Sequence, residues 1–232
     1  MLGFSEIVSL NQIERDVWVQ AAIKKYFDKP GVVLDIGAGT SPYREHLGSH
    51  KYVAHDFGEY SGVKLGGGVD YATLDIKSDV LSIPLETETV DYVLCTEVLE
   101  HVPEPLGALQ EISRLLRHGG RAVITAPFTS GRHQAPFHFY SGFSEFFYKL
   151  AEERYNFKLI ELTSHGGYLR LLAQEICRVT GYYSALEKVG FKSSVADING
   201  VFLNIANELL SLDRSIKDDF MTIGYWVVYE KK

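Results

Sequence analysis

The sequence predicts an α/β fold built on a doubly wound parallel sheet. From Val32 onward, short apolar runs alternate with amphipathic stretches, and this order is typical of strand–helix repeats. Each run is apolar enough to be buried on both faces of a sheet, as the strands of parallel sheets are. At 232 residues the chain has the length of one α/β domain with a modest insertion. We therefore expect a single domain over residues 1–232.

A helix is expected ahead of the first strand. Ser9 and Gln12 form a capping-box pattern, and apolar residues recur at helical spacing from Leu10 onward. We predict a helix that begins at this cap and ends before Pro30, within an N-terminal helical segment of residues 1–30.

Seven strands and a crossover helix follow in order. Pro105 to His118 has one apolar face and precedes Gly119, which favours a helix that ends there. A loop is expected over Gly58 to Gly68, which contains five glycines. The predicted strands are Val32 to Ile36, Tyr52 to Ala54, Tyr71 to Leu74, Tyr92 to Cys95, Ala122 to Thr125, Phe157 to Leu162 and Thr222 to Glu230, with a loop over Thr129 to Ser141 and a helix over Ser144 to Glu153 before the sixth.

The stretch before the last strand, residues 164–219, is a predicted helical insertion. Tyr168 to Val179 and Val195 to Leu212 have helical periodicity. Packing on their own domain is the simplest role for these helices, and the alternatives are a cap over an acceptor site or a membrane face. The second helix has a narrow apolar stripe, so a homodimer formed through residues 195–212 is a further alternative.

Composition excludes several classes of protein. A formal net charge of -7 disfavours nucleic acid as the main partner. Cys95 and Cys177 show neither a disulfide framework nor metal-ligand spacing, so we predict no metal site and a cytoplasmic location. No run is apolar for long enough to predict a transmembrane segment.

The sharpest motif is the glycine turn that ends the first strand. Asp35 precedes Gly37, Ala38 and Gly39, and glycines in such a turn let a ligand approach the backbone closely. Asp56 ends the next strand, where a carboxylate can accept hydrogen bonds from the hydroxyls of a ribose. The spacing of the two acids predicts a nucleoside-binding unit.

Further stretches extend this pattern: Asp79 to Leu85, Val90 to Cys95, Glu97 to Val102 and Leu115 to Arg121. With them, the sequence resembles class I S-adenosylmethionine-dependent methyltransferases, in the branch of small single-domain enzymes of methyltransferase type 11. The resemblance covers about Gly31 to Phe128. Ser41, where many members carry a third glycine, and His118, where a proline is common, depart from the pattern. The resemblance implies a Rossmann-like sheet of seven strands whose last strand is antiparallel.

It also implies how S-adenosylmethionine would be bound. Asp35 would face the ammonium group of the cofactor, and backbone amides after Gly39 would bind its carboxylate. Asp56 would bind the ribose. Asp79, with Asp75 as the competitor, and the Val80 amide would bind the adenine, while Phe57 or Ile83 would cover a ring face. Thr96 and Glu97 would line the methyl-transfer crevice, and His101 would form a wall of the cofactor pocket rather than act as a base.

Candidate catalytic residues follow the fifth strand. His133, His138 and Tyr140 lie in a loop over the same crevice, where they could deprotonate an acceptor. Packing or contact with the substrate is the competing interpretation, because methyl transfer from a sulfonium can be accelerated by positioning alone.

The sequence therefore predicts methyl transfer to a small-molecule, saccharide or lipid-linked acceptor. Two other functions remain open. One is an interaction subunit that binds the cofactor without catalysis, and the other is a nicotinamide-dependent oxidoreductase. The oxidoreductase fits less well, because Ser41 and Pro42 interrupt the remaining glycine pattern of dinucleotide-binding proteins.

Overall fold

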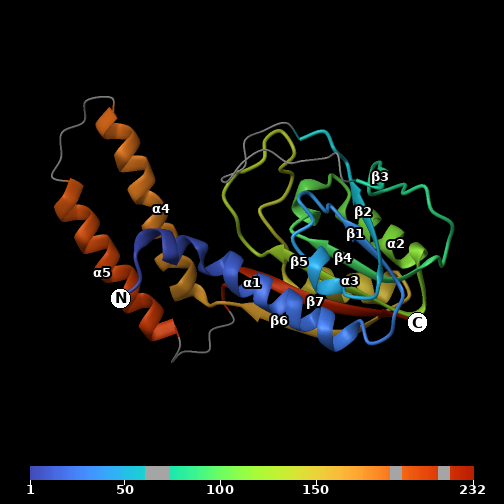
Figure 1. The fold of residues 1–232 in the computed structure, drawn as a ribbon. Coiled ribbons are helices and arrows are strands. Elements are labelled where there is room, and N and C mark those ends of the chain that lie inside the picture. The colour runs from blue at the N-terminus through green and yellow to red at the C-terminus, as the bar shows by residue number, and fades with distance from the viewer. Residues whose placement is uncertain (61–73, 189–194, 214–219) are drawn as a thin grey trace. The chain divides into compact units, whose positions relative to one another are not determined.

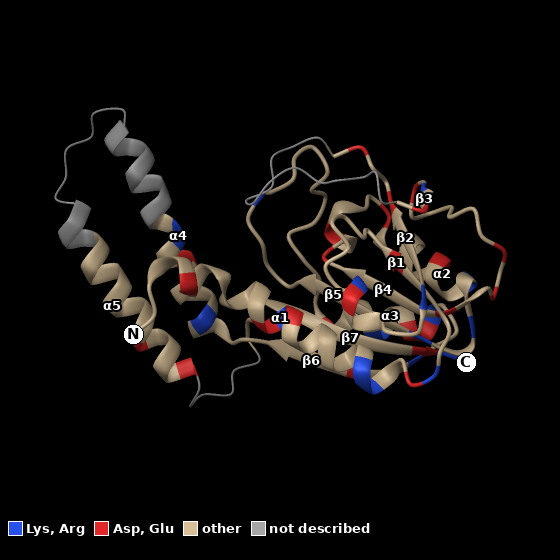
Figure 2. Cartoon of the chain, viewed as in Figure 1, with Lys and Arg blue, Asp and Glu red and all other residues tan. Residues whose placement is uncertain are grey.

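The computed structural model of the protein describes residues 1–60, 74–188, 195–213 and 220–232 (Figure 1). The chain packs as two units. The sheet unit comprises Val17–Thr163 and Gly224–Lys232, and the helical unit comprises Met1–Asp16 and Ser164–Ile223. Within the described residues, no helix is long and apolar enough to cross a membrane. Acidic and basic residues are interspersed along the elements (Figure 2).

The elements alternate as the sequence predicts. The strands are β1 (Val32–Ile36), β2 (Lys51–Asp56), β3 (Ile76–Lys77), β4 (Val90–Thr96), β5 (Leu116–Pro127), β6 (Phe157–His165) and β7 (Gly224–Lys231). The helices are α1 (Phe4–Tyr26), α2 (Pro105–Leu115), α3 (Glu145–Arg154), α4 (Tyr168–Lys188) and α5 (Val195–Asp213), with the short 3₁₀ helices η1 (Arg44–Leu47) and η3 (Leu99–His101).

The seven strands form one sheet in the order β3-β2-β1-β4-β5-β7-β6. Strand β1 pairs in parallel with β2 and with β4, β4 pairs in parallel with β5, and β7 is antiparallel to β5. This confirms the predicted doubly wound fold with an antiparallel last strand. Because the carboxyl ends of β1, β2, β4 and β5 meet at one edge, the residues after these strands are brought together.

The core lies on both faces of this sheet, because successive strand residues point to opposite sides. On one face, Leu34 and Ile36 of β1 pack in a cluster with Leu109 and Ile112 of α2 and with residues of α3. On the other face, Val33 packs in a cluster with the last part of α1 from Val19 onward, with Phe27 just after it, and with Leu47 of η1. The buried strands of the sheet unit are thus covered by helices on both sides, as their apolar sequence predicts.

The helical unit combines the first part of α1 with α4 and α5. Its buried cluster contains Ile7 of α1, Ala173 and Cys177 of α4, and Ala206 and Leu210 of α5. Arg170 of α4 adds charge contacts, an ion pair with Glu14 and another with Asp213, whose Oδ2 lies 3.2 Å from Nε. The insertion predicted over residues 164–219 falls within this unit, and the assignment of residues 1–232 to a single domain stays a prediction.

Two predicted helix boundaries are wrong. Helix α1 begins at Phe4 and includes Ser9, because Ile7 is buried in the helical unit and extends the helix toward the N-terminus. The start is capped instead by Glu6, whose Oε2 accepts a hydrogen bond from the Gly3 amide at 2.7 Å. Helix α2 ends at Leu115 rather than at His118, because β5 already begins at Leu116.

The third strand also differs from its prediction. It is β3 at Ile76–Lys77, and the end of the predicted strand, Leu74, precedes it outside any strand. Residues 71–73 and most of the predicted glycine loop lie outside the described residues. The remaining helices and strands overlap their predicted ranges.

Candidate cofactor and acceptor site

The glycine turn after β1 has a left-handed backbone. The φ angles are 69° at Gly37, 55° at Gly39 and 55° at Ser41. A Cβ atom on Gly37 would lie 2.4 Å from Cγ2 of Val98, so glycine is also required for the turn to pack against the segment after β4. Ser41 occupies the conformation that a glycine prefers, which explains why a third glycine is common at this position. The glycine turn after β1 therefore packs against the segment that follows β4.

Asp35 is the buried acid of this site, with 1% of its surface exposed. Tyr52, which sequence analysis missed, donates a hydrogen bond from its hydroxyl to Oδ2 at 2.7 Å. Burial raises the pKa of Asp35 to about 7, and the charge of Asp56 acts in the same direction. A cation beside Asp35 would favour the ionised carboxylate, as the ammonium of the cofactor would.

Asp56 accepts hydrogen bonds from two backbone amides, one in the glycine turn and one just after β2. Its Oδ2 accepts a hydrogen bond from the Gly39 amide at 3.1 Å, and its Oδ1 accepts one from the Gly58 amide at 2.8 Å. An ionised carboxylate has about four acceptor positions, so each oxygen keeps capacity for a further donor. The carboxylate is thereby held at the end of β2, with acceptor positions left for the two hydroxyls of a ribose.

The predicted adenine residues lie beyond the next turn. Asp79 is exposed, and its Oδ1 accepts a hydrogen bond from the Leu81 amide at 2.9 Å, while Val80 is buried. The competitor Asp75 instead accepts a hydrogen bond from the Ala54 amide at 2.8 Å, which gives it a structural role beside β2. Phe57 is 46% exposed, so its ring has accessible surface on which an adenine ring could stack.

Thr96 is the last residue of β4 and Glu97 follows it, at the edge where the strands' carboxyl ends meet. Glu97 has a left-handed φ of 55°. Its amide donates to the Thr125 carbonyl at 2.9 Å, and its Oε1 accepts from Thr125 Oγ1 at 2.9 Å. These two hydrogen bonds link the residue after β4 to β5. The role of Glu97 in lining the methyl-transfer crevice stays a prediction.

The predicted histidines are brought together, although they follow different strands. The ring of His133 lies 4.8 Å from that of His101 and 4.7 Å from that of His138. Phe137, from the same loop, packs edge-on against Phe57 with ring centroids 5.7 Å apart. The loop after β5 therefore contacts both His101 and the predicted adenine cover.

Tyr140 has a different environment from the histidines. Its hydroxyl donates a hydrogen bond to the Pro103 carbonyl at 3.0 Å, and its ring packs against Phe143. These contacts describe a side chain that anchors the loop, which weakens the case for Tyr140 as a base. Its catalytic role was predicted only from its position in the loop.

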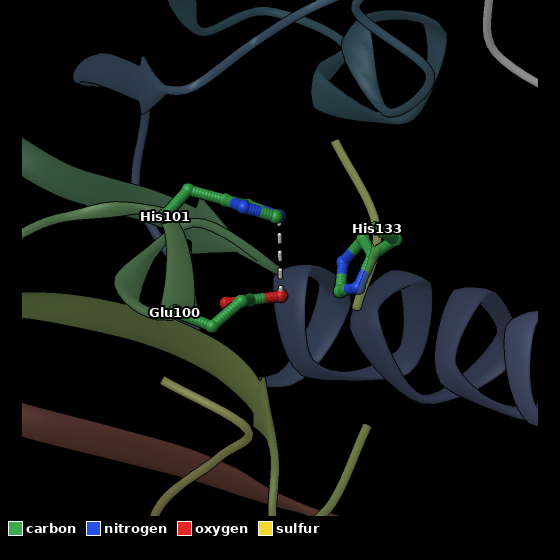
Figure 3. Close-up of side chains that lie close together, drawn as sticks. All are labelled: Glu100, His101 and His133. Carbon is green, nitrogen blue, oxygen red and sulfur yellow. Dashed lines mark ion pairs between the residues drawn. The ribbon is translucent and has the colours of Figure 1, made fainter. Parts of the chain in front are cut away.

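Glu100 is a second residue of this site, after Tyr52, that sequence analysis missed. It is fully buried, and its Oε1 lies 3.6 Å from Nε2 of His101 (Figure 3). A charged residue between apolar Leu99 and Val102 was a signal of unusual burial, because a carboxylate inside a protein is rarely isolated. The structure thus adds a buried carboxylate to the three histidines.

Comparisons with known proteins agree with this geometry. A family model described as a methyltransferase domain matches residues 34–124. A ubiquinone biosynthesis O-methyltransferase of Hahella chejuensis is 27% identical over 180 residues, which are 72% of this chain and 73% of that protein. One from Aeromonas salmonicida is 28% identical over 132 residues, 53% of this chain, so the match spans about half (52%) of that enzyme.

A solved structure shows the same fold. Phosphoethanolamine N-methyltransferase 2 of Haemonchus contortus, in complex with S-adenosyl-L-methionine, superposes with a TM-score of 0.53 at 17% identity, covering 92% of this chain and 52% of that one. The matched family segment runs from β1 through β5 and includes the glycine turn, Asp56, Asp79 and Glu100. Residues 34–124 therefore match a methyltransferase domain, and the chain shares the fold of a solved methyltransferase that binds S-adenosyl-L-methionine.

Proposed function

We propose that the protein transfers a methyl group from S-adenosylmethionine to a small-molecule, saccharide or lipid-linked acceptor. The observation that carries this proposal is the pair of acids around one glycine turn, with Asp35 buried behind it and Asp56 bonded to its Gly39 amide. An ammonium and a ribose diol are the groups that such a pair suits. When bound, S-adenosylmethionine supplies a methyl group that its sulfonium has already activated for in-line displacement.

The residues that would hold the cofactor lie along one edge of the sheet. Asp35 would bind the ammonium, Asp56 the ribose, and Asp79 with the Val80 amide the adenine. Phe57 would cover a face of the adenine ring. Thr96, Glu97 and His101 would border the methyl end, since they follow β4 and the Val98 side chain contacts the turn at Gly37.

The chain's own contribution is to orient the acceptor and to remove its proton. His138 is the better base candidate on charge, because burial and the neighbouring His133 and Arg132 lower its pKa and keep the imidazole neutral at pH 7. Its Nε2 lies 3.3 Å from Ser130 Oγ, which orients the ring. His133 is the second candidate, and Tyr140 the third.

A hydroxyl is the acceptor group that we favour. The two curated relatives described above are named O-methyltransferases, which supports oxygen over nitrogen. We extend the proposal to a cytoplasmic enzyme that forms a homodimer through residues 195–212, where Val201, Ile205 and Leu212 of α5 are exposed.

Calorimetric titration with S-adenosylhomocysteine tests the cofactor site. Asp56→Ala should weaken binding roughly ten- to a hundredfold, because it removes a charged hydrogen-bond acceptor worth about 1.5–3 kcal/mol. Asp56→Asn keeps one side-chain acceptor for the turn and should bind with intermediate affinity. Glu86→Ala, an exposed acid away from this edge, is the matched control.

Two results would reject the proposal. One is a wild-type protein that does not bind S-adenosylhomocysteine, and the other is an unchanged affinity in a folded Asp56→Ala variant. Titration with NAD in the same experiment separates the oxidoreductase alternative. Binding without methyl transfer to any acceptor class would favour the interaction subunit.

A further inference from the structure

Three potential ligand side chains converge beside the proposed acceptor crevice. Glu100 and His101 are neighbours on η3, and His133 belongs to the loop after β5 (Figure 3). One ligand atom from each residue lies within 4.8 Å of the other two. Nε2 of His101 lies 3.6 Å from Oε1 of Glu100.

The loop that carries His133 is tied to η3 by its backbone. The Glu100 carbonyl accepts hydrogen bonds from the amides of Phe139 at 3.0 Å and Tyr140 at 3.2 Å. The Tyr140 hydroxyl adds the bond to Pro103. These contacts fix the loop over η3, so the approach of His133 to Glu100 and His101 follows from the fold.

Both imidazoles are oriented in the way that metal-binding histidines are. Nδ1 of His101 lies 2.5 Å from the Phe137 carbonyl oxygen, and Nδ1 of His133 lies 2.9 Å from the Gly131 carbonyl oxygen. A carbonyl oxygen can only accept, so Nδ1 carries the proton in each ring and Nε2 of the neutral imidazole carries the lone pair. Metal-ligating histidines typically use a backbone carbonyl in this role.

The carboxylate completes the donor set. Glu100 is fully buried, and transfer of a carboxylate from water into a protein interior costs several kcal/mol unless a cation or strong donors compensate. Two imidazole nitrogens and one carboxylate oxygen suit Zn²⁺ or another divalent transition metal better than Mg²⁺, which prefers oxygen ligands alone.

We propose that Glu100, His101 and His133 bind a divalent transition-metal cation that leaves coordination positions open for an acceptor oxygen. Bonds of about 2.0–2.2 Å to one ion bring its ligand atoms to roughly 3–3.5 Å from one another. The three ligand atoms lie within 4.8 Å of one another, so small side-chain movements toward the ion would satisfy this geometry. No metal site is predicted from the sequence, because that prediction considers only Cys95 and Cys177, which lack metal-ligand spacing.

The place of this cluster gives the cation a role in the proposed methyl transfer, on which this part of the inference rests. Val98 links η3 to the glycine turn, and Phe137 links the loop to Phe57. A cation here lowers the pKa of a hydroxyl ligand, as bound metals do for water. The hydroxyl proton passes to water or His138. The acceptor oxygen then forms the new C–O bond as the C–S bond breaks, and the sulfonium becomes a neutral thioether.

An ion pair between protonated His101 and Glu100 is the competing account. This account involves two of the three residues and does not by itself require His133 to lie beside them. It also predicts a titrating pair that binds no metal. The two accounts therefore differ in a direct measurement.

The test uses tag-free, chelator-treated full-length protein titrated with ZnCl₂ by calorimetry, and with CoCl₂ by visible absorption. We expect one equivalent of Zn²⁺ and the d–d bands of a bound Co²⁺. Glu100→Gln and His133→Ala should each weaken Zn²⁺ binding by roughly a hundredfold or more, since even groups that only orient metal ligands are worth about 10–100-fold. His118→Ala removes an exposed histidine elsewhere and should bind as the wild type does.

S-adenosylhomocysteine binding by the same proteins separates the two proposals. If it binds to wild type and to His133→Ala, but Zn²⁺ does not bind to wild type, the metal site is rejected and the cofactor site stands. Equal Zn²⁺ uptake by wild type and His133→Ala also rejects the metal site. If Glu100→Gln fails to fold, His133→Ala alone decides, because His133 is less buried than Glu100.

Discussion

The sheet unit and the helical unit are stabilised in different ways. In the sheet unit, large apolar side chains fill both sides of the strands, and Leu34, Leu109 and Ile112 are fully buried. In the described part of the helical unit, the buried apolar cluster has five residues, and three of them, Ala173, Cys177 and Ala206, have small side chains. The comparison teaches that the sheet unit gains most from burial, whereas the helical unit relies more on close helix contact and on the Arg170 ion pairs.

We expect the largest effect on stability from Asp35. It is an acid buried inside the sheet unit, so the stability that this unit gains from burial should depend on pH. Burial raises its pKa from 3.8 to about 7, so the folded state holds the proton over a pH range in which the unfolded state has lost it. The free energy of unfolding should therefore decrease as the pH rises from about 4 to about 7, by about 4 kcal/mol for a shift of about three pKa units.

Urea denaturation at several pH values measures this effect. Asp35→Asn cannot ionise and should lack the decrease, so its stability relative to wild type should improve as the pH rises from 4 to 8. Tyr52→Phe is a useful companion, because it removes the hydrogen bond to Oδ2 and leaves the acid in place. Parallel pH profiles for wild type and Asp35→Asn would show that Asp35 does not hold a proton near neutral pH.

A matched pair of leucines tests the comparison directly. Leu109→Ala in the sheet unit should lower the free energy of unfolding by about 3–4 kcal/mol, because a fully buried side chain leaves a cavity among rigid neighbours. Leu210→Ala in the helical unit should lower it by about 2 kcal/mol, since small neighbours on two helices can close the space. Denaturation followed by circular dichroism gives both values. Equal losses would contradict the difference between the units.

The smallest effect on stability is expected at the exposed row of α5. Ile205 is 43% exposed, so Ile205→Glu should change the free energy of unfolding by less than about 0.5 kcal/mol. If the proposed homodimer forms through this helix, light scattering should show half the mass of wild type. Asn204→Glu, an exposed neighbour, is the control for added charge. An unchanged mass for Ile205→Glu would remove this face from any dimer contact.

Local patterns predicted most of the fold, because each strand except β3 was marked by its own apolar run. The glycine turn was equally readable, since its function and its conformation both need Gly37 and Gly39. The start of α1 could not be predicted from the local sequence, because the burial of Ile7 depends on partners almost two hundred residues away, in α5.

The site shows the same division. Asp35 and Asp56 follow directly from strand ends, whereas the partnership of Asp35 with Tyr52 and the burial of Glu100 depend on pairing between strands and on a distant loop. The convergence of His133 with His101 required the backbone bonds from Phe139 and Tyr140 to Glu100, which leave no trace in residue spacing. The sequence therefore predicted which edge of the sheet carries the candidate site, but not which side chains contact one another there.

The strand order has a consequence for how the protein is made. Strand β7 lies between β5 and β6 in the sheet, although it follows both along the chain. During synthesis from the N-terminus, β6 leaves the ribosome before β7, the strand that separates it from β5 in the sheet. Helix α1 is likewise made long before the helices that complete its unit. The hydrogen-bonding edge of β5 stays open until β7 arrives, so a nascent chain that stalls before residue 224 presents an unpaired strand edge to other chains.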